Sequence, residues 1–303
     1  MGNLTTDVDH TLWLADRFEE HRSRLRAVAY RMLGSLSEAD DAVQDAWLRV
    51  SRAGADGVND LGAWLTTVVA RVCLNELRAR HTRREEPFAP ELPDPVITTD
   101  STVQPEEQAL LADSVGLALL VVLDTLTPAE RLAFVLHDTF GLPFEDIAPL
   151  VERTPAAARQ LASRARRRVR GAGVPSPDAD LARQREVVDA FFAAARGDDF
   201  DTLLSLLDPD VVLRADFGRP RTAVPSVTRG RDKVAQYALR GAAIQGELHP
   251  ILVNGAPGVL VVARGKPFAV LGFIVAGGRI REIDGIGSPE RVRRIAAGVL
   301  AAL

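Results

Sequence analysis

The stretch PFEDIAPLVERTPAAARQLASRARRRVR, residues 143–170, decides the fold of the middle of this chain. Its first part predicts a short helix that ends near Pro149. Thr154 and Pro155 then supply an N-cap and a first-turn proline for a second, longer helix. A short helix, a tight turn and a longer basic helix together predict a helix-turn-helix.

The second of these helices is rich in arginine and has no acidic residue, although the whole chain carries a net charge of −4. Such a run can simply be a solvated helix face. Here no acids are interleaved to form stabilising i, i+4 pairs, so the like charges repel one another. The phosphates of a nucleic acid would offset that repulsion. We therefore predict that this helix binds DNA through Arg159, Arg164, Arg166 and Arg167.

Residues 12–84 repeat apolar side chains at helical spacing, which predicts three or four packed helices. Ser37 is the expected N-cap of the second helix, and Asn59 or Asp60 the expected start of the third. The segment SEADDAVQDAW at 37–47 carries only acidic charges and would repel DNA. A protein partner with a basic surface explains this segment better than a catalytic pair of carboxylates does. The predicted protein-binding residues are Asp40, Asp41, Gln44 and Asp45.

The following helix, TVVARVCLNELRARHTRR, carries a second basic stretch. Arg71, Asn75, Arg78 and Arg80 are expected along one flank, downstream of Trp64. Basic and amide groups beside an aromatic ring suit single-stranded or melted DNA, in which an unstacked base can be held. Trp64 itself is more typical of a core residue than of a stacking platform, and the arginines could also form a solvated face.

Two proline-containing segments divide the chain. Residues 85–105 contain five prolines without sustained periodicity and are expected to be a linker, and residues 173–180 form a second one. After the second linker the pattern changes to a pair of amphipathic helices and then to strand-like runs bounded by Gly, Pro and Asp. This order predicts an α+β domain with a curved antiparallel sheet.

The composition, with 47% hydrophobic and 26% charged residues, is that of an ordinary globular protein. The first residues lack a basic and then apolar signal sequence, so we expect a cytoplasmic protein. The longest apolar run, VGLALLVVL at 115–123, is about half of a membrane span and predicts a buried helix, with no membrane partner. Cys73 is the single cysteine and the histidines lack metal-ligand spacing, so no metal, cofactor or catalytic residue is expected.

These features, in this order, resemble the extracytoplasmic-function sigma factors, which direct bacterial RNA polymerase to promoters. AYRMLGSLSEADDAVQDAWLRV and AWLTTVVARVCLNELRARHTRR are similar to region 2 of that family. LTPAERLAFVLHDTFGLPFEDIAPLVERTPAAARQLASRARRRV is similar to region 4, and the resemblance covers residues 12–172. It implies two partners: core RNA polymerase, met at its β′ clamp helices and β flap, and promoter DNA at its minus-ten and minus-thirty-five elements.

The resemblance also implies roles for the predicted residues. It assigns Asp40, Asp41, Gln44 and Asp45 to docking on the β′ clamp helices. The next helix, with Arg71, Asn75 and Arg78, would read and melt the minus-ten element. The final helix, with Arg159, Arg164 and their neighbours, would read the minus-thirty-five element in the major groove. The loop at 52–60 corresponds to the family's pocket for a flipped base.

The last third of the chain is similar to the SnoaL-like domain, a cone-shaped α+β fold that is fused behind region 4 in one subset of these sigma factors. That subset carries a Trp-Leu-Pro-Glu-Pro motif in the linker, which Leu92, Pro93, Asp94 and Pro95 fit, with Glu91 in place of the aromatic residue. It also carries a Gly-rich loop and an Asn-Pro-Asp-Lys motif, to which ADFGRP at 215–220 and SPERV at 288–292 are loosely similar. The resemblance implies that the fused domain tunes activity.

We therefore expect a multidomain protein with two all-α sigma domains, the second a helix-turn-helix, followed by an α+β SnoaL-like domain. The expected bounds are 12–84, 106–172 and 181–303. A helix-turn-helix regulator that senses an unknown small ligand in the apolar cavity of the cone is an alternative. A SnoaL-type enzyme is another, with Asp216, His249 and Asp284 as the acid–base candidates.

Overall fold

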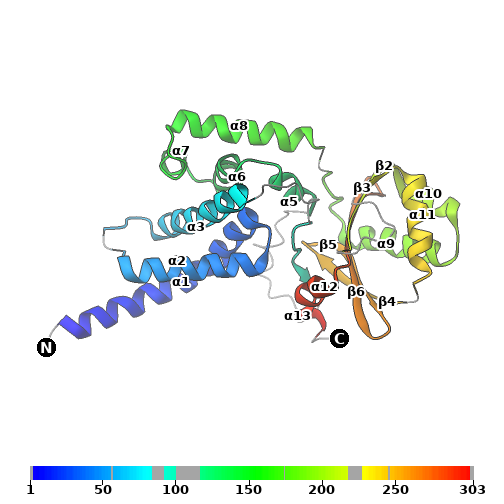
Figure 1. Cartoon of the computed structure of the whole chain (residues 1–303), viewed down its shortest axis with the longest axis horizontal. Coiled ribbons are helices and arrows are strands. Elements are labelled where there is room, and N and C mark those ends of the chain that lie inside the picture. Colours follow the sequence, from blue (N-terminus) through cyan, green and yellow to red (C-terminus); the bar gives the residue numbers. More distant parts are fainter. Residues whose placement is uncertain are drawn as a thin grey trace. The chain divides into compact units, whose positions relative to one another are not determined.

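The computed structural model describes residues 3–55, 57–83, 92–99, 117–173, 175–217, 227–244 and 246–300. The chain forms two compact units (Figure 1). The first unit comprises Met1–Pro87 and Leu120–Gly173, and the second comprises Phe88–Leu119 and Val174–Leu303. In the described part of the chain, no helix is long and apolar enough to cross a membrane.

Three helices form the N-terminal part of the first unit: α1 (Asn3–Leu33), α2 (Leu36–Ala53) and α3 (Leu61–Arg83). They enclose a core of fully buried side chains that includes Phe18, Met32, Val43, Leu65 and Val69. The Asp60 carboxylate accepts a hydrogen bond from the Ala63 N–H at 2.9 Å, so the predicted start of the third helix is confirmed. Burial raises the pKa of the Cys73 thiol in α3 to about 12 and keeps it protonated at neutral pH.

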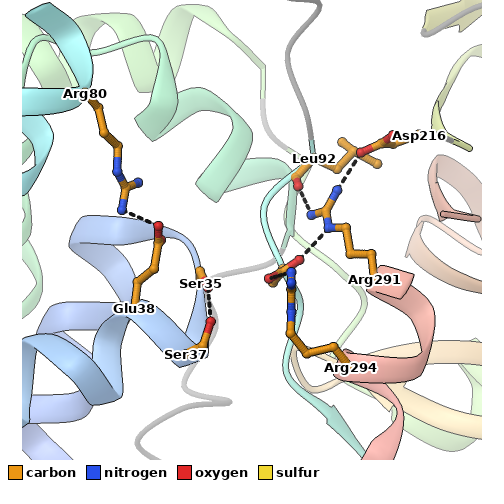
Figure 2. Close-up of polar contacts among 9 residues, drawn as sticks. Ser35, Ser37, Glu38, Arg80, Leu92, Asp216, Arg291 and Arg294 are labelled. Carbon is orange, nitrogen blue, oxygen red and sulfur yellow. Dashed lines mark hydrogen bonds and ion pairs between the residues drawn. The ribbon is translucent and has the colours of Figure 1, made fainter. Parts of the chain in front are cut away.

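The predicted start of α2 at Ser37 is wrong by two residues. Gly34 has a positive φ of 77° and Ser35 is extended, so the chain has already turned and α2 begins at Leu36. The Ser37 hydroxyl lies in the first turn, 3.0 Å from the Ser35 hydroxyl (Figure 2). A glycine that ends one helix thus decided where the next helix begins.

The second part of this unit contains α5 (Leu117–Asp124), α6 (Pro128–Phe134), the π-helical turn η1 (Val135–Thr139), α7 (Phe144–Ile147) and α8 (Pro155–Gly171). The predicted capping box is present, because the Thr127 hydroxyl accepts from the Glu130 N–H and the Glu130 carboxylate accepts from the Thr127 N–H. Thr154 caps α8 by accepting from the Ala157 N–H at 3.2 Å. The predicted helix-turn-helix, α7 followed by α8, is confirmed.

The two parts of the first unit pack against each other, α3 on α6 and α1 on η1. Arg131 in α6 is 2% exposed, forms an ion pair with Asp124 and donates a hydrogen bond to the Arg31 carbonyl at 3.1 Å. The Arg31 guanidinium in turn lies over the Phe140 ring, 5.1 Å from its centroid. The helices that the sequence divides with a linker thus form one packed body.

The second unit is built on a seven-stranded sheet with the order β1-β4-β5-β6-β7-β2-β3. Its strands are β1 (Ile97–Thr98), β2 (Leu207–Asp216), β3 (Val227–Arg229), β4 (Gly246–Val253), β5 (Ala256–Ala263), β6 (Lys266–Ala276) and β7 (Arg279–Ile286). Its helices are α9 (Leu181–Arg196), α10 (Phe200–Leu206), α11 (Arg231–Ala242), α12 (Pro289–Ile295) and α13 (Ala297–Leu300). The expected α+β class is confirmed.

The sheet departs from the antiparallel expectation at one place, because β2 and β7 pair in parallel. The two strands are separated by four other strands and a helix along the chain, so no tight turn imposes an antiparallel pairing. Around this pairing, α9 packs on β5, β6 and β7, and α11 packs on β2. The apolar core between helices and sheet includes Val188, Phe191, Leu203, Phe273 and Ile283.

Candidate polymerase-binding and DNA-binding surfaces and the linker clamp

The exposed side of α2 follows from the spacing of its buried residues Ala39, Ala42, Val43, Ala46 and Val50. Asp41 and Gln44 point away from this stripe and are exposed. Leu48, one turn after Gln44, is 43% exposed and completes a surface that we call the docking face: Asp41, Gln44 and Leu48. The sequence reasoning missed Leu48, although its i+4 spacing from Gln44 is visible in the sequence.

The other two predicted acids of α2 are engaged with arginines. Asp40 accepts two hydrogen bonds from Arg26 of α1, at 2.6 and 3.0 Å. Asp45 pairs with Arg49 one turn later, at 2.7 Å. Among the described residues, Asp41 has no such side-chain partner, so its charge is the one most readily offered to another protein.

The basic flank of α3 brings together three of the four residues predicted there. Arg71, Asn75 and Arg78 are exposed and lie at i, i+4 and i+7 spacing, one above the other. Arg78 also approaches Glu152, in the turn before α8, at 3.5 Å. The side chain of Trp64 is half-buried, as expected for a residue at the edge of the core.

Arg80 does not join that flank. Its guanidinium forms an ion pair of 2.6 Å with Glu38 of α2 (Figure 2). It also donates a hydrogen bond to the Leu33 carbonyl at 3.3 Å. It therefore holds the start of α2 against α3. The loop at 52–60, which the resemblance assigns to a flipped base, includes Asp56, which lies outside the described residues.

The arginines of α8 divide into an anchored group and an open group. Arg166 forms an ion pair with Asp138 at 2.8 Å, and Arg168 forms one with Glu130 at 3.0 Å. Burial of Glu130 opposes its ionisation, but the hydrogen bonds from Thr127 and Arg168 outweigh burial and lower its pKa. Arg166 and Arg168 thus tie α8 to α6 and η1.

The open group projects from the other side of α8. Ala158, Ala162 and Ala165 are completely buried, so these small side chains seat the helix closely on its neighbours. Arg164 and Arg167 are exposed, with no ion pair to a carboxylate among the residues that the structure describes. Arg159 is also exposed, and its guanidinium lies over the Phe144 ring at 5.1 Å, which orients it.

In the second unit, the predicted linker motif is held by α12 through a group that we call the linker clamp: Asp94, Asp216, Arg291 and Arg294. Arg291 donates to Asp94 and to Asp216, each at 2.5 Å, and also to the Leu92 carbonyl (Figure 2). Arg294 donates to the second oxygen of Asp94 at 2.8 Å. Leu92, Pro93, Asp94 and Pro95 are all buried.

The residues after this motif become part of the sheet. Ile97 and Thr98 form β1, which pairs antiparallel with β4. Just before it, Val96 donates its N–H to the Asn254 side chain at 2.7 Å and accepts from the Asn254 N–H at 2.8 Å. A proline-rich segment that was expected to be a linker therefore forms the edge of a folded domain. Arg291, within SPERV, was not predicted to hold it.

The three acid–base candidates lie away from the cavity of the cone. In β2 and β7, Leu213 and Ile283 line that cavity, so the alternating residues Arg214 and Asp284 lie on the opposite face of the sheet. Arg214 binds Asp284 at 3.1 Å and Glu282 at 2.9 Å. His249 and Asp216 are not among the cavity residues either.

The buried carboxyl group of Asp284 should make the stability of the protein depend on pH. Burial raises its pKa to about 6 despite the attraction of Arg214, with Glu282 adding repulsion. Between about pH 4 and 6 the folded protein keeps a proton that the unfolded chain has lost, so the free energy of unfolding falls as pH rises. The fall is up to about 3 kcal/mol at 1.36 kcal/mol per pH unit. We expect Asp284→Asn to remove it, as measured by urea unfolding followed by far-UV circular dichroism.

Tryptophan fluorescence supplies the control for this experiment, because Trp13, Trp47 and Trp64 all belong to the first unit. The fluorescence transition of that unit should not change with the substitution. A pH dependence that persists in Asp284→Asn would assign it to other groups.

Comparison with known proteins finds relatives of this chain. Residues 17–83 match the model of sigma-70 region 2, and residues 116–169 match that of sigma-70 region 4. The ECF RNA polymerase sigma factor SigJ of Mycobacterium tuberculosis (strain ATCC 25618 / H37Rv) is 38% identical over 288 residues, which cover 90% of this chain and 91% of that protein. The probable ECF RNA polymerase sigma factor SigI of Mycobacterium tuberculosis (strain CDC 1551 / Oshkosh) is 35% identical, covering 89% and 91%.

The crystal structure of Mycobacterium tuberculosis extracytoplasmic function sigma factor SigJ superposes with a TM-score of 0.71 and 34% identity, covering 91% of this chain and 97% of that chain. The match extends over the helical regions and the C-terminal SnoaL-like domain. This chain therefore belongs to the extracytoplasmic-function sigma factors, a non-enzymatic family, and it binds RNA polymerase and directs transcription initiation at promoters.

Proposed function

We propose that the docking face of α2 binds the β′ clamp helices of the polymerase and that the helix-turn-helix part meets the β flap. On promoter DNA, Arg71, Asn75 and Arg78 contact the minus-ten element. The open arginines of α8, Arg164 and Arg167 with the oriented Arg159, contact the minus-thirty-five element. The anchored residues Arg80 and Arg166 would have to break ion pairs to reach DNA, so we assign them to holding the helices.

The two proposed DNA-binding surfaces, on α3 and α8, are packed within one unit, and this packing supports a regulatory proposal. Elements at minus ten and minus thirty-five are about 25 base pairs apart, or roughly 85 Å at 3.4 Å per base pair. Arg78 on the minus-ten flank lies 3.5 Å from Glu152, in the turn before α8. Surfaces this close cannot contact both elements, so the unit must open on the promoter.

We infer that the SnoaL-like domain controls this opening through the linker clamp. The clamped segment, residues 92–98, lies between the two sigma regions along the chain. Held in the sheet, it restricts the paths that the chain can take between the regions. When the segment is released from the sheet, the two sigma regions can separate more freely. The domain would thus bias the protein between closed and promoter-competent states, in the cytoplasm where polymerase acts.

Run-off transcription with core polymerase tests the DNA assignment. We expect Arg164→Ala to cost about 1 to 3 kcal/mol in promoter binding and to relax the preference at one upstream position, if the side chain makes a bidentate contact to guanine. Arg183→Ala, in an exposed arginine of α9, is the matched control. A loss that is equal on every DNA sequence would mark a phosphate contact, and no loss with Arg164→Ala and Arg167→Ala combined would contradict the assignment.

A further inference from the structure

A cavity of about 450 Å³ lies in the SnoaL-like domain, between α9, α11 and the face of the sheet that these helices cover. Figure 1 shows both helices against the strands. Its size is that of pockets for drug-sized molecules. Its walls are largely apolar and include six aromatic residues: Phe191, Phe192, Phe217, Tyr237, Phe268 and Phe273. The residues proposed to bind polymerase and promoter DNA are not among those that line this cavity.

The polar side chains in the cavity are few and of one sign. The residues that line it include no carboxylate and no histidine, within the described part of the chain. Its polar side chains are those of Arg196, Tyr237 and Arg240. The described lining therefore has no carboxylate that would repel an acidic ligand. It also has no general acid–base pair that would indicate catalysis. The cavity combines apolar walls with guanidinium groups alone.

Both arginines are exposed and stand at the ends of the helices that border the cavity. Arg196 is the last residue of α9, and its guanidinium donates to the Gly246 carbonyl at 2.9 Å. Arg240, near the end of α11, lies over the Tyr237 ring at 5.2 Å. In the described part of the chain, neither forms an ion pair with a carboxylate. Their remaining N–H groups are available to an anion.

The same rim carries apolar side chains that are exposed to water, and this exposure costs free energy. Ile244 is 45% exposed and Phe268 is 37% exposed, and both line the cavity. Together with the two arginines, Ile244 and Phe268 form an entrance that combines apolar surface with positive charge. Guanidinium groups bind carboxylates with paired, charge-assisted hydrogen bonds, and aromatic walls favour the apolar remainder of a ligand.

We propose that this cavity binds a lipophilic carboxylic acid, with its apolar body among the aromatic rings and its carboxylate at Arg196 and Arg240. The proposal concerns ligand binding alone and does not depend on the linker clamp. Binding can be measured without polymerase or promoter, so its failure would leave the proposed control of the linker untouched.

The test uses the full chain and 11-(dansylamino)undecanoic acid, whose fluorescence rises in an apolar site. Dodecanoic acid is expected to displace this probe at least tenfold more effectively than dodecan-1-ol, which has the same chain without the charge. The double variant Arg196→Gln, Arg240→Gln should reduce that preference below threefold. Arg279→Gln, in an exposed arginine outside the cavity, should keep it.

Filling the cavity is the second arm. Ala238→Trp should abolish binding of the probe. Ala238→Leu, which should weaken probe binding, replaces it if circular dichroism shows that the larger residue prevents folding. Equal displacement by acid and alcohol would overturn the assignment of the arginines. Probe binding that is unchanged in both Ala238 variants, or absent from the wild-type protein, would overturn the cavity as a ligand site.

Discussion

Reversing the charge of the docking face should abolish binding to core polymerase. In the variant Asp41→Lys, Gln44→Lys, two positive groups replace a carboxylate and an amide on the exposed side of α2. Facing a basic partner, they would lose an attraction and add repulsion, which together cost several kcal/mol and raise the dissociation constant at least a hundredfold. Fluorescence anisotropy of the labelled full chain, titrated with core polymerase, measures the loss.

Asp16→Lys is the matched control, because Asp16 is an exposed acid on α1 outside the docking face. It changes the net charge of the chain in the same direction and should leave binding within about twofold, as surface charges away from the contact do. An unchanged melting temperature would show that the double variant is folded. Normal core binding by that folded variant would exclude the docking face.

Opening the linker clamp should release β1 from the sheet. Asp94→Ala removes the carboxylate that both Arg291 and Arg294 bind, and leaves the Arg291 side chain, which is only 12% exposed, with one acidic partner, Asp216. Breaking a buried pair in this way costs about 3 kcal/mol. We therefore expect the amide of Val96 to exchange its hydrogen roughly a hundredfold faster, as measured by hydrogen–deuterium exchange of the intact protein.

Promoter-specific run-off transcription should change with the exchange rate. Increased transcription would identify the clamp as inhibitory, and reduced transcription would identify it as activating. Arg293→Ala, in the neighbouring residue of α12 outside the clamp, is the control, and Asp94→Asn should give an intermediate effect because it keeps the shape of the side chain. Faster exchange at Val96 with unaltered transcription would contradict control through the linker.

Local features of the sequence predicted the helices well. The capping box at Thr127, the cap at Thr154 and the start at Asp60 all form as expected, because each depends on residues within one turn. Of the apolar run, Leu120, Val122 and Leu123 in α5 are buried, as its length indicated. By contrast, β1, β3 and β4 were not predicted. The first two are only two and three residues long, and β4 contains Pro250, which is atypical of a strand interior.

The division of α8 into anchored and open arginines shows what local patterns leave out. Arg164 and Arg166 look equivalent in the sequence, since both are arginines in an acid-free run. Arg166 faces Asp138 of η1, whereas Arg164 faces outward, because the helix rotates by about 100° per residue and its alanine stripe fixes which side is covered. The exposed or engaged state of each charge is a property of the packing.

Caps, periodicity and composition along short stretches encode the helix-turn-helix, the acidic charge of residues 37–47, the basic charge of residues 154–170 and the family. Three features follow from the tertiary fold alone: residues 92–98 join the sheet, Arg291 holds Asp94, and the cavity is apolar with arginines at its rim. Arg291 and Asp94 are 197 residues apart, and two such groups pair only when the fold brings them within hydrogen-bonding distance. Their interaction depends on distance in space, to which local sequence patterns are blind.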